Sequence, residues 1–240
     1  MKNLNNLFDE FNYHLLNDIK PSNYFDRMLL EEKKIYNNSP LKILIDLRKI
    51  QQNPKYHPEG NVYNHTMEVV DRAARIKTLS SDDRIFMWAA LLHDVGKITT
   101  TKIRKGRITS YDHDRQGENI ARNFLLDYTH DTIFINKVVK MVRWHMQPLF
   151  ICKELPFAEI ENMIKETSVT DIACISLCDR LGRGTMSIEE TNKQMNFIIK
   201  FLNICYERNI DEKEKARIGI VKNYLINEIN EIKDASKIQF

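Results

Sequence analysis

The chain has 240 residues, of which 42% are hydrophobic, and its formal net charge is +3. This length and composition allow a sizeable core, which excludes disorder as the default state. The small positive charge is below that of most dedicated nucleic-acid-binding domains, but it suits a small anionic substrate.

The longest uninterrupted apolar run covers residues 85–92 and is far too short to span a membrane. The N-terminal region carries Asp9 and Glu10 and has no apolar signal segment. We therefore expect a cytoplasmic protein without a membrane partner. The 4 cysteines include no CxxC pair, so we expect reduced, mostly buried thiols.

Glycine and proline are scarce, with 7 and 6 residues, which favours long helices over a sheet with many turns. Residues 1–38 are polar with interleaved aromatic residues and predict an N-terminal helical extension. We expect the main domain over 39–185 and C-terminal helices packed on it over 186–240. The hydrophobic spacing predicts helices over residues 40–50, 62–77, 85–92, 115–128, 131–146, 157–166, 168–181, 187–207 and 211–233.

Several helix ends are marked by capping residues. Pro40 suits a first helical position, Asn61 is a good N-cap, and Ser80 with Asp83 resembles a capping box. Gly96 is expected to end the helix that is apolar all round. The polar stretch that follows it predicts a small hairpin, so the fold class is all-α with little strand.

The last predicted helix, 211–233, has an apolar stripe at helical spacing. Such a stripe usually packs on the core of its own chain. A homodimer is the alternative use of the same stripe.

Histidine and aspartate fall at informative places on these helices. His65 lies near the apolar stripe of its helix, and His93-Asp94 closes the fully apolar helix. Burying an imidazole beside a carboxylate is costly unless something compensates both, and a metal ion would do so. His145 and Asp179 continue the apolar stripes of two further helices.

His113 stands at the start of another predicted helix, so five segments each direct a polar group toward one interior. Each residue alone also has a simpler interpretation. A single inward histidine is usually a hydrogen-bonded core residue, and Asp179 would pair with Arg180 or Arg183. His14, His57 and His130 lack such a setting and are expected at the surface or in loops.

At this point the sequence resembles the HD-domain phosphohydrolases. His65, then His93-Asp94 in LLHDVGK (91–97), then Asp179 in SLCDRLGR are similar to that family's H…HD…D signature. The strings HPEGNVYNHT (57–66) and YDHDRQGENIA (111–121) further resemble the HD domain of bacterial tRNA nucleotidyltransferases. The resemblance covers roughly residues 40–185 and implies an HD-domain helical bundle with additional N- and C-terminal helices.

The residues before position 40 lack the paired carboxylates that a nucleotidyltransferase core needs. We therefore expect no CCA addition, and an HD domain that acts as an independent hydrolase.

The resemblance implies that His65, His93, Asp94 and Asp179 bind a first divalent ion, with Mn, Fe, Co, Ni, Zn or Mg as candidates. In the two-metal branch of the family, Asp94 bridges to a second ion, for which His113 and His145 are the matching ligands. In the one-metal alternative these two histidines contact the phosphate or the leaving group.

Two basic residues close to the signature are candidates for substrate binding. Lys97 directly follows the HD turn and would stabilise charge on the phosphate, so we assign it and Asp94 catalytic roles. Its alternative is a solvated lysine at a helix end. Arg183 is a weaker substrate-binding candidate.

A basic run follows, with Lys102, Arg104, Lys105 and Arg107 and no acid between Lys97 and Tyr111. Arg107 is a further substrate-binding candidate, since the run either steers an anionic substrate or an RNA end, or is a solvated surface. Glu59 and Asn61 either orient His65 or form a turn and a cap.

Three functions follow from these patterns. The first is a metal-dependent phosphomonoesterase or phosphodiesterase that acts on a small phosphorylated substrate such as a nucleotide, a cyclic nucleotide or an RNA end. The second is a non-catalytic metal-binding or nucleotide-binding regulatory module. The third is a di-iron oxygenase, because some proteins of this fold use a similar ligand set for oxygen chemistry.

Overall fold

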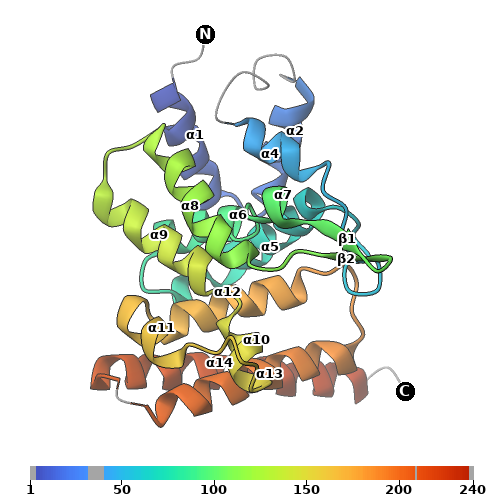
Figure 1. Ribbon diagram of the computed structural model, residues 1–240. Helices are drawn as coiled ribbons and strands as arrows, with labels where there is room; N and C mark the ends of the chain where they lie inside the picture. The colour runs from blue at the N-terminus through green and yellow to red at the C-terminus, as the bar shows by residue number, and fades with distance from the viewer. Residues whose placement is uncertain (1–3, 32–40, 209, 238–240) are drawn as a thin grey trace.

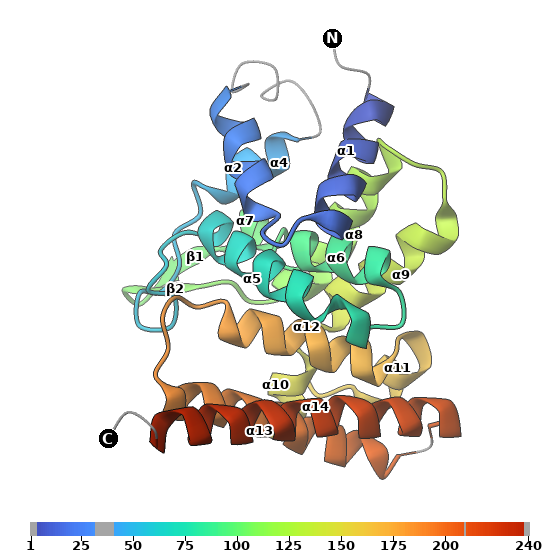
Figure 2. The same cartoon turned by 180° about the vertical axis from the view of Figure 1, so that it is seen from behind.

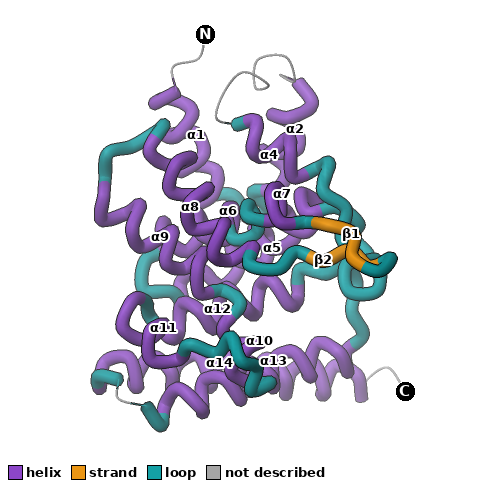
Figure 3. Tube along the Cα trace, in the orientation of Figure 1, coloured by secondary structure: helices purple, strands orange, loops and turns teal. Residues whose placement is uncertain are grey.

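The computed structural model describes residues 4–31, 41–208 and 210–237 and shows a helical bundle with one small hairpin (Figure 1). The expected all-α class is confirmed. Within these ranges the strands are β1 (Lys102–Arg104) and β2 (Arg107–Thr109), which form the predicted hairpin and are drawn in orange in Figure 3. The helices are α1 (Leu4–Asn17), α2 (Ser22–Glu31), α4 (Lys42–Leu47), α5 (Val62–Ile76), η1 (Lys77–Leu79), α6 (Asp83–Leu92), α7 (Lys97–Thr100), α8 (His113–Leu126), α9 (Thr132–Trp144), α10 (Gln147–Cys152), α11 (Ile160–Glu166), α12 (Val169–Leu181), α13 (Ile188–Tyr206) and α14 (Glu212–Lys237).

Helix α6 is the centre of the domain, because it is apolar on every side and residues 85–92 are all buried. It packs against α1, α5, α9 and α12. The N-terminal aromatic residues complete this core: Phe8 stacks on Trp88 with ring centroids 4.9 Å apart, and Phe11 meets Phe25 edge to face at 5.0 Å. The N-terminal helices are therefore part of the core around α6.

Helix α12 connects the two layers of the bundle. It lies between the α5–α6 side and the pair α13–α14, as the two opposite views show (Figures 1 and 2). The predicted stripe of α14 is turned toward this interior, since Ile218, Val221 and Leu225 are buried. The stripe thus packs on its own chain as expected, while the boundaries proposed at residues 38 and 185 stay a prediction. No helix in the described ranges is both long and apolar enough to cross a bilayer.

Some helix ends differ from the sequence-based expectation. The N-cap of α6 is Asp82, whose side chain accepts a hydrogen bond from the Ile85 amide, whereas the Ser80 hydroxyl donates to the Lys77 carbonyl within the preceding turn. The capping role predicted for Ser80 is therefore wrong. The one- and two-turn helices α7 and α10 were not predicted, because so few residues show no periodicity. Pro40 lies outside the described residues.

We expected Gly96 to end α6, but this helix already ends at Leu92, and the φ of Gly96 is −64°. Gly96 instead marks a close approach between two helices. A Cβ at Gly96 would lie 1.9 Å from the His113 carbonyl oxygen and 2.6 Å from the Gly117 nitrogen. Only glycine lets the turn after α6 rest directly on the backbone of α8.

We predict that Gly96→Ala lowers the free energy of unfolding by about 1–3 kcal/mol, because the added methyl group overpacks a backbone contact. Gly219→Ala is the matched control, since a Cβ there meets nothing within 4 Å in the interior of α14. That variant should gain about 0.5–1 kcal/mol from its higher helix propensity. Urea denaturation followed by circular dichroism measures both, and equal stability of Gly96→Ala and the wild type would contradict the close approach.

Candidate metal centre

Six polar residues from five parts of the chain meet in the interior beside α6. His65 lies on α5, His93 and Asp94 follow α6, His113 begins α8, His145 follows α9, and Asp179 lies on α12. Each is at most 9% exposed. The structure thus brings together all six residues that the sequence analysis selected as ligands.

Asp94 lies in the middle of this group, and its two carboxylate oxygens face different partners. Its Oδ2 is 3.3 Å from His93 Nε2 and 3.7 Å from His65 Nε2. Its Oδ1 is 3.4 Å from His113 Nε2 and 3.9 Å from His145 Nε2. One carboxylate therefore joins two pairs of imidazoles.

The possible ligand atoms form two compact groups around this carboxylate. His65, His93 and Asp179 offer one group, and Asp94, His113 and His145 offer the other, with the ligand atoms of each group all within 4.8 Å of one another. Imidazole nitrogen and carboxylate oxygen are donors that suit first-row transition metals. The donor set therefore fits one or two divalent ions.

The other ring nitrogen of each histidine is held by a main-chain carbonyl. Nδ1 lies 2.8 Å from the Gly182 oxygen in His65, 2.9 Å from the Ala90 oxygen in His93, 2.7 Å from the Ser110 oxygen in His113 and 2.6 Å from the Val142 oxygen in His145. A carbonyl can only accept, so Nδ1 carries the proton and donates. In a neutral imidazole this leaves a lone pair on Nε2, which faces the centre. His65 differs from the other three: burial would lower its pKa, but Asp179 and Glu59 raise it to about 9, so without a bound cation its Nε2–H donates to Asp179 at 3.1 Å.

This arrangement is unfavourable without a cation between the rings. Burial lowers the pKa of His145 to about 4, with His113 and His93 adding to the effect, and burial also lowers the pKa of His113. Both rings are then neutral, and their Nε2 lone pairs lie 3.2 Å apart. The buried Nε2 of His93 has no hydrogen-bond partner within the described ranges. A metal ion in each of the two groups of donor atoms would satisfy all three nitrogens.

Both aspartates remain ionised in this interior. Burial alone would raise the pKa of Asp94, but Lys97 and His93 hold it well below its usual range. Burial would likewise raise the pKa of Asp179, but Arg183 and His65 hold it well below the usual range. The two carboxylates are thus available as anionic ligands.

Of the three substrate-binding candidates, Lys97 and Arg183 contact the candidate ligands and Arg107 does not. Lys97 is only 9% exposed, its Nζ is 2.6 Å from Asp94 Oδ2, and it donates a hydrogen bond to Gln52 at 2.7 Å. Its alternative as a solvated lysine is therefore wrong. Arg183 pairs with Asp179 at 3.0 Å. Arg107 is exposed on β2, and across the described ranges no ion pair or hydrogen bond joins its side chain to the six residues.

The loop before α5 brings two further polar residues, His57 and Glu59, next to His65. His57 was expected at the surface or in a loop, but its loop folds inward, leaving its side chain only 13% exposed. Glu59 Oε1 is 2.8 Å from His57 Nδ1 and 2.9 Å from His65 Nδ1. Burial would raise the pKa of Glu59, but these hydrogen bonds lower it to about 2. Glu59 thus orients a candidate ligand, and the signal for it was its place in HPEGNVYNHT.

The remaining residues behave more simply. Asn61 caps α5 as predicted, since its side chain accepts from the Asn64 amide at 2.9 Å. His130 is exposed, as expected. His14 is half-buried on α1, where its ring stacks on Tyr24 with centroids 3.8 Å apart.

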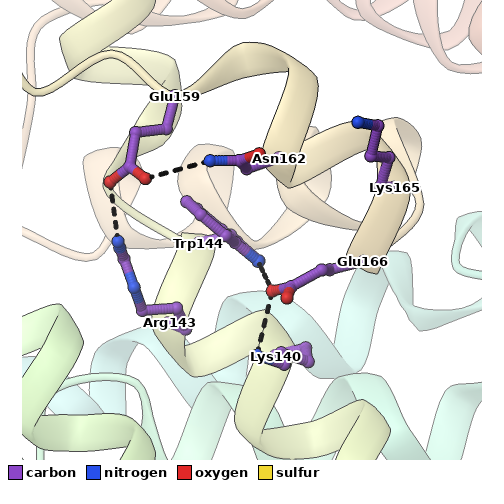
Figure 4. A pocket seen from close by; sticks show the side chains of 7 residues that line it. All are labelled: Lys140, Arg143, Trp144, Glu159, Asn162, Lys165 and Glu166. Atoms are coloured by element: carbon purple, nitrogen blue, oxygen red, sulfur yellow. Dashed lines mark hydrogen bonds and ion pairs between the residues drawn. The ribbon is translucent and has the colours of Figure 1, made fainter.

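A surface pocket of about 310 Å³ lies between α9 and α11 (Figure 4). None of the six candidate ligands lines it, and most of its polar groups pair with each other. Trp144 Nε1 and Lys140 Nζ both reach Glu166, at 2.8 and 2.9 Å. Arg143 binds Glu159 at 2.8 Å. These pairs engage most of the polar groups that line the pocket, and they join α9 to α11.

The same Arg143 also makes a buried ion pair close to two of the candidate ligands. Its guanidinium donates to Asp114 at 2.7 Å, and both side chains are less than 10% exposed. Asp114 directly follows His113 on α8, and Arg143 stands two residues before His145. This buried ion pair therefore holds together the two helix ends that carry these histidines.

Comparison with known proteins agrees with this geometry. The HD domain family matches residues 62–183, which is just over half of the chain. The Multifunctional CCA protein of Actinobacillus pleuropneumoniae serotype 5b is 23% identical over 189 residues, which are 75% of this chain and 44% of that protein. The proteins of the same name from Halorhodospira halophila and Thioalkalivibrio sulfidiphilus are 33% and 30% identical over 97 and 96 residues, in each case 40% of this chain and 22% of the relative. The chain thus spans less than half the length of these relatives.

We predict that Arg143→Met lowers the free energy of unfolding by about 3–5 kcal/mol, because it leaves the buried Asp114 carboxylate without its cation. Arg115→Met is the matched control: it also removes an arginine bound to Glu159, but its side chain is 57% exposed. That change should cost no more than about 0.5 kcal/mol. Chemical denaturation measures both variants, and similar losses in the two would show that burial of the pair is unimportant.

Proposed function

Because the chain belongs to the HD domain family, we propose that it is a metal-dependent phosphohydrolase with a two-ion centre, acting on a phosphoester of a nucleotide or of an RNA end. The observation that carries this proposal is the carboxylate of Asp94, whose two oxygens face two separate pairs of imidazole nitrogens. HD domains bind divalent metals and are usually hydrolases, which supports the general assignment.

The proposed ligands follow from the two groups of donor atoms. His65, His93, Asp179 and Oδ2 of Asp94 would hold the first ion. His113, His145 and Oδ1 of Asp94 would hold the second. When bound, such ions act as Lewis acids that activate a water molecule and stabilise negative charge on phosphoryl oxygens.

The orientation of His113 and His145 favours ligation over direct phosphate binding. A phosphate oxygen accepts hydrogen bonds, so a residue that binds it must donate. The only N–H of each neutral ring is Nδ1–H, and it already points to a main-chain carbonyl. The inward Nε2 carries a lone pair, which binds a cation and repels a phosphate oxygen. This favours the two-ion centre over the one-ion alternative.

Lys97 and Arg183 are the proposed phosphate-binding residues. The Lys97 ammonium lies against Asp94 and is oriented by Gln52, so its charge is held next to the centre in a largely desolvated place. The Arg183 guanidinium is held by Asp179, and its side chain is 28% exposed. Both cations would stabilise charge on the phosphoryl oxygens as the ester bond breaks, where fixed charges are most effective.

The substrate class rests on charge and on the relatives. Lys97 and Arg183 favour a compact anionic group. The relatives are named Multifunctional CCA protein, a tRNA nucleotidyltransferase, which supports a nucleotide or an RNA end as the molecule that carries the phosphoester.

We predict that protein purified without chelator contains about two metal equivalents and that His113→Ala/His145→Ala contains about one, because only the second group of ligands is removed. Elemental analysis of both proteins after supply of Mn or Fe measures this. His130→Ala is the control, since its ring is exposed and distant in sequence from every ligand.

The same preparations test the activity. Removal of the metal with chelator should abolish phosphate release from nucleoside monophosphates and ring opening of cyclic nucleotides to monophosphates, and Mn should restore both. A protein that binds metal but hydrolyses none of these esters and no RNA-terminal phosphate would contradict the hydrolase and favour a binding module. Visible absorption from bound iron together with oxygen consumption would favour an oxygenase.

We further predict that Glu59→Gln weakens metal binding roughly 10- to 100-fold, since it removes the negative charge that orients and polarises His65. Glu161→Gln is the control, because that carboxylate lies on α11 and is 59% exposed. Competition with a metal-sensitive dye compares the two variants. If Glu59→Gln bound metal as tightly as the wild type, Glu59 would have only a structural role in its loop.

A further inference from the structure

The β1–β2 hairpin is built directly onto the wall of the metal centre. It is inserted between α7, which begins with Lys97, and α8, which begins with His113. A hydrogen bond of 2.8 Å between the Thr101 and Ser110 hydroxyls closes its base. The Ser110 carbonyl in turn accepts from His113 Nδ1 at 2.7 Å. A molecule bound along the hairpin would therefore end near the candidate ligands.

The register of the hairpin gathers its charges on one side. Lys102 pairs with Thr109, and Arg104 pairs with Arg107. Residues paired across two antiparallel strands lie on the same face of the ribbon, and alternate residues of one strand share a face. Lys102, Arg104 and Arg107 thus share one face, which we call the basic face.

The basic face is unfavourable for the hairpin itself. Like charges directly opposite each other destabilise a strand pair, and Arg104 stands opposite Arg107. The segment 102–107 contains no acid, and within the described ranges no ion pair is made by Lys102, Lys105 or either arginine. Arg104 donates a hydrogen bond to Thr109 at 2.6 Å on the same face, but no carboxylate of the described residues neutralises these charges, whereas a partner with repeated negative charge would.

An exposed aromatic ring stands next to the basic face. The Arg104 guanidinium carbon lies 4.8 Å from the centroid of the Tyr111 ring, and Tyr111 is 64% exposed. Phosphate-binding cations interleaved with exposed aromatic and guanidinium planes are the elements that bind single-stranded nucleic acid, because bases stack on the planes while the backbone follows the charges.

We propose that the basic face and Tyr111 bind the backbone and a base of a single-stranded nucleic acid, whose terminal phosphoester then reaches the metal centre. The second clause rests on the proposed function, but the first does not. The hairpin would thus make an oligonucleotide a better substrate than a mononucleotide with the same terminal phosphate.

The test is fluorescence anisotropy of the full chain with labelled RNA and DNA strands of about 12 nucleotides, a length in the range that single-strand-binding sites cover. The strands lack a terminal phosphate, and the KCl concentration is varied. Lys102→Ser/Arg104→Ser should weaken binding at least roughly tenfold and reduce the salt slope by about 1.4, since each lost phosphate contact on a single strand removes about 0.7. Tyr111→Ala should weaken binding roughly fivefold or more without changing the slope.

Lys193→Ser/Lys213→Ser is the matched control. It removes the same charge from exposed positions on α13 and α14, in the layer below α12 in Figure 1, and should bind like the wild type. Binding of the RNA or the DNA strand that depends on Lys102 and Arg104 supports the proposal. Failure of both strands to bind, or an equal loss in the control, overturns it.

The two proposals fail in different ways. Release of phosphate from a mononucleotide without oligonucleotide binding overturns the role of the hairpin and leaves the hydrolase intact. Binding of the strands through Lys102 and Arg104 by a protein that hydrolyses no phosphoester supports the hairpin and overturns the hydrolase.

Discussion

The ionised carboxylate of Asp94 is the group on which the rest of the structure depends. It is buried at the end of a fully apolar helix, where an unpaired charge would be very costly. Four imidazoles and the Lys97 ammonium surround it, and they come from α5, the end of α6, α7, α8 and the end of α9. The bundle must therefore hold α5, α6, α8 and α9 in fixed positions, and the contact of Gly96 with the α8 backbone and the Arg143–Asp114 ion pair both serve that requirement.

Helix ends supply the second part of this arrangement. His93 and His145 each directly follow a helix, and each donates Nδ1–H to the carbonyl three residues earlier, Ala90 and Val142. The last carbonyls of a helix have no partner within the helix. Each histidine thus satisfies one of these carbonyls and at the same time fixes its own Nε2 toward the centre. The same local geometry occurs at the ends of α6 and α9. The main chain of the preceding helix thus orients two of the candidate ligands, and no other side chain is needed to hold their Nδ1 atoms.

The sequence predicted those features that repeat or stand at a helix end, and it missed those that depend on contacts between distant segments. Hydrophobic spacing located the long helices, and the inward positions of His65, His145 and Asp179 followed from the same spacing. The roles of Gly96 and His57 did not follow, because one is set by the backbone of α8 and the other by the path of a loop. The position of Lys97 was left open between the site and the solvent for a similar reason, since its partner Gln52 lies 45 residues earlier.

The segment between Asp94 and His113 is rigid at its ends and exposed in its middle, and this difference explains why its basic residues gather in the middle. Its ends must stay fixed, because Asp94 and His113 face each other across 3.4 Å, and the one-turn helix α7 and the Thr101–Ser110 hydrogen bond provide short, rigid connections. The middle of the segment does not need to hold these two residues in place, because the hairpin beyond these connections is largely exposed. Positive charges that would be unfavourable in the buried centre can therefore stand on the exposed hairpin, beside the candidate metal ligands, at little cost to the geometry of those ligands. Substitutions in the hairpin are therefore expected to leave the arrangement of the candidate ligands in place.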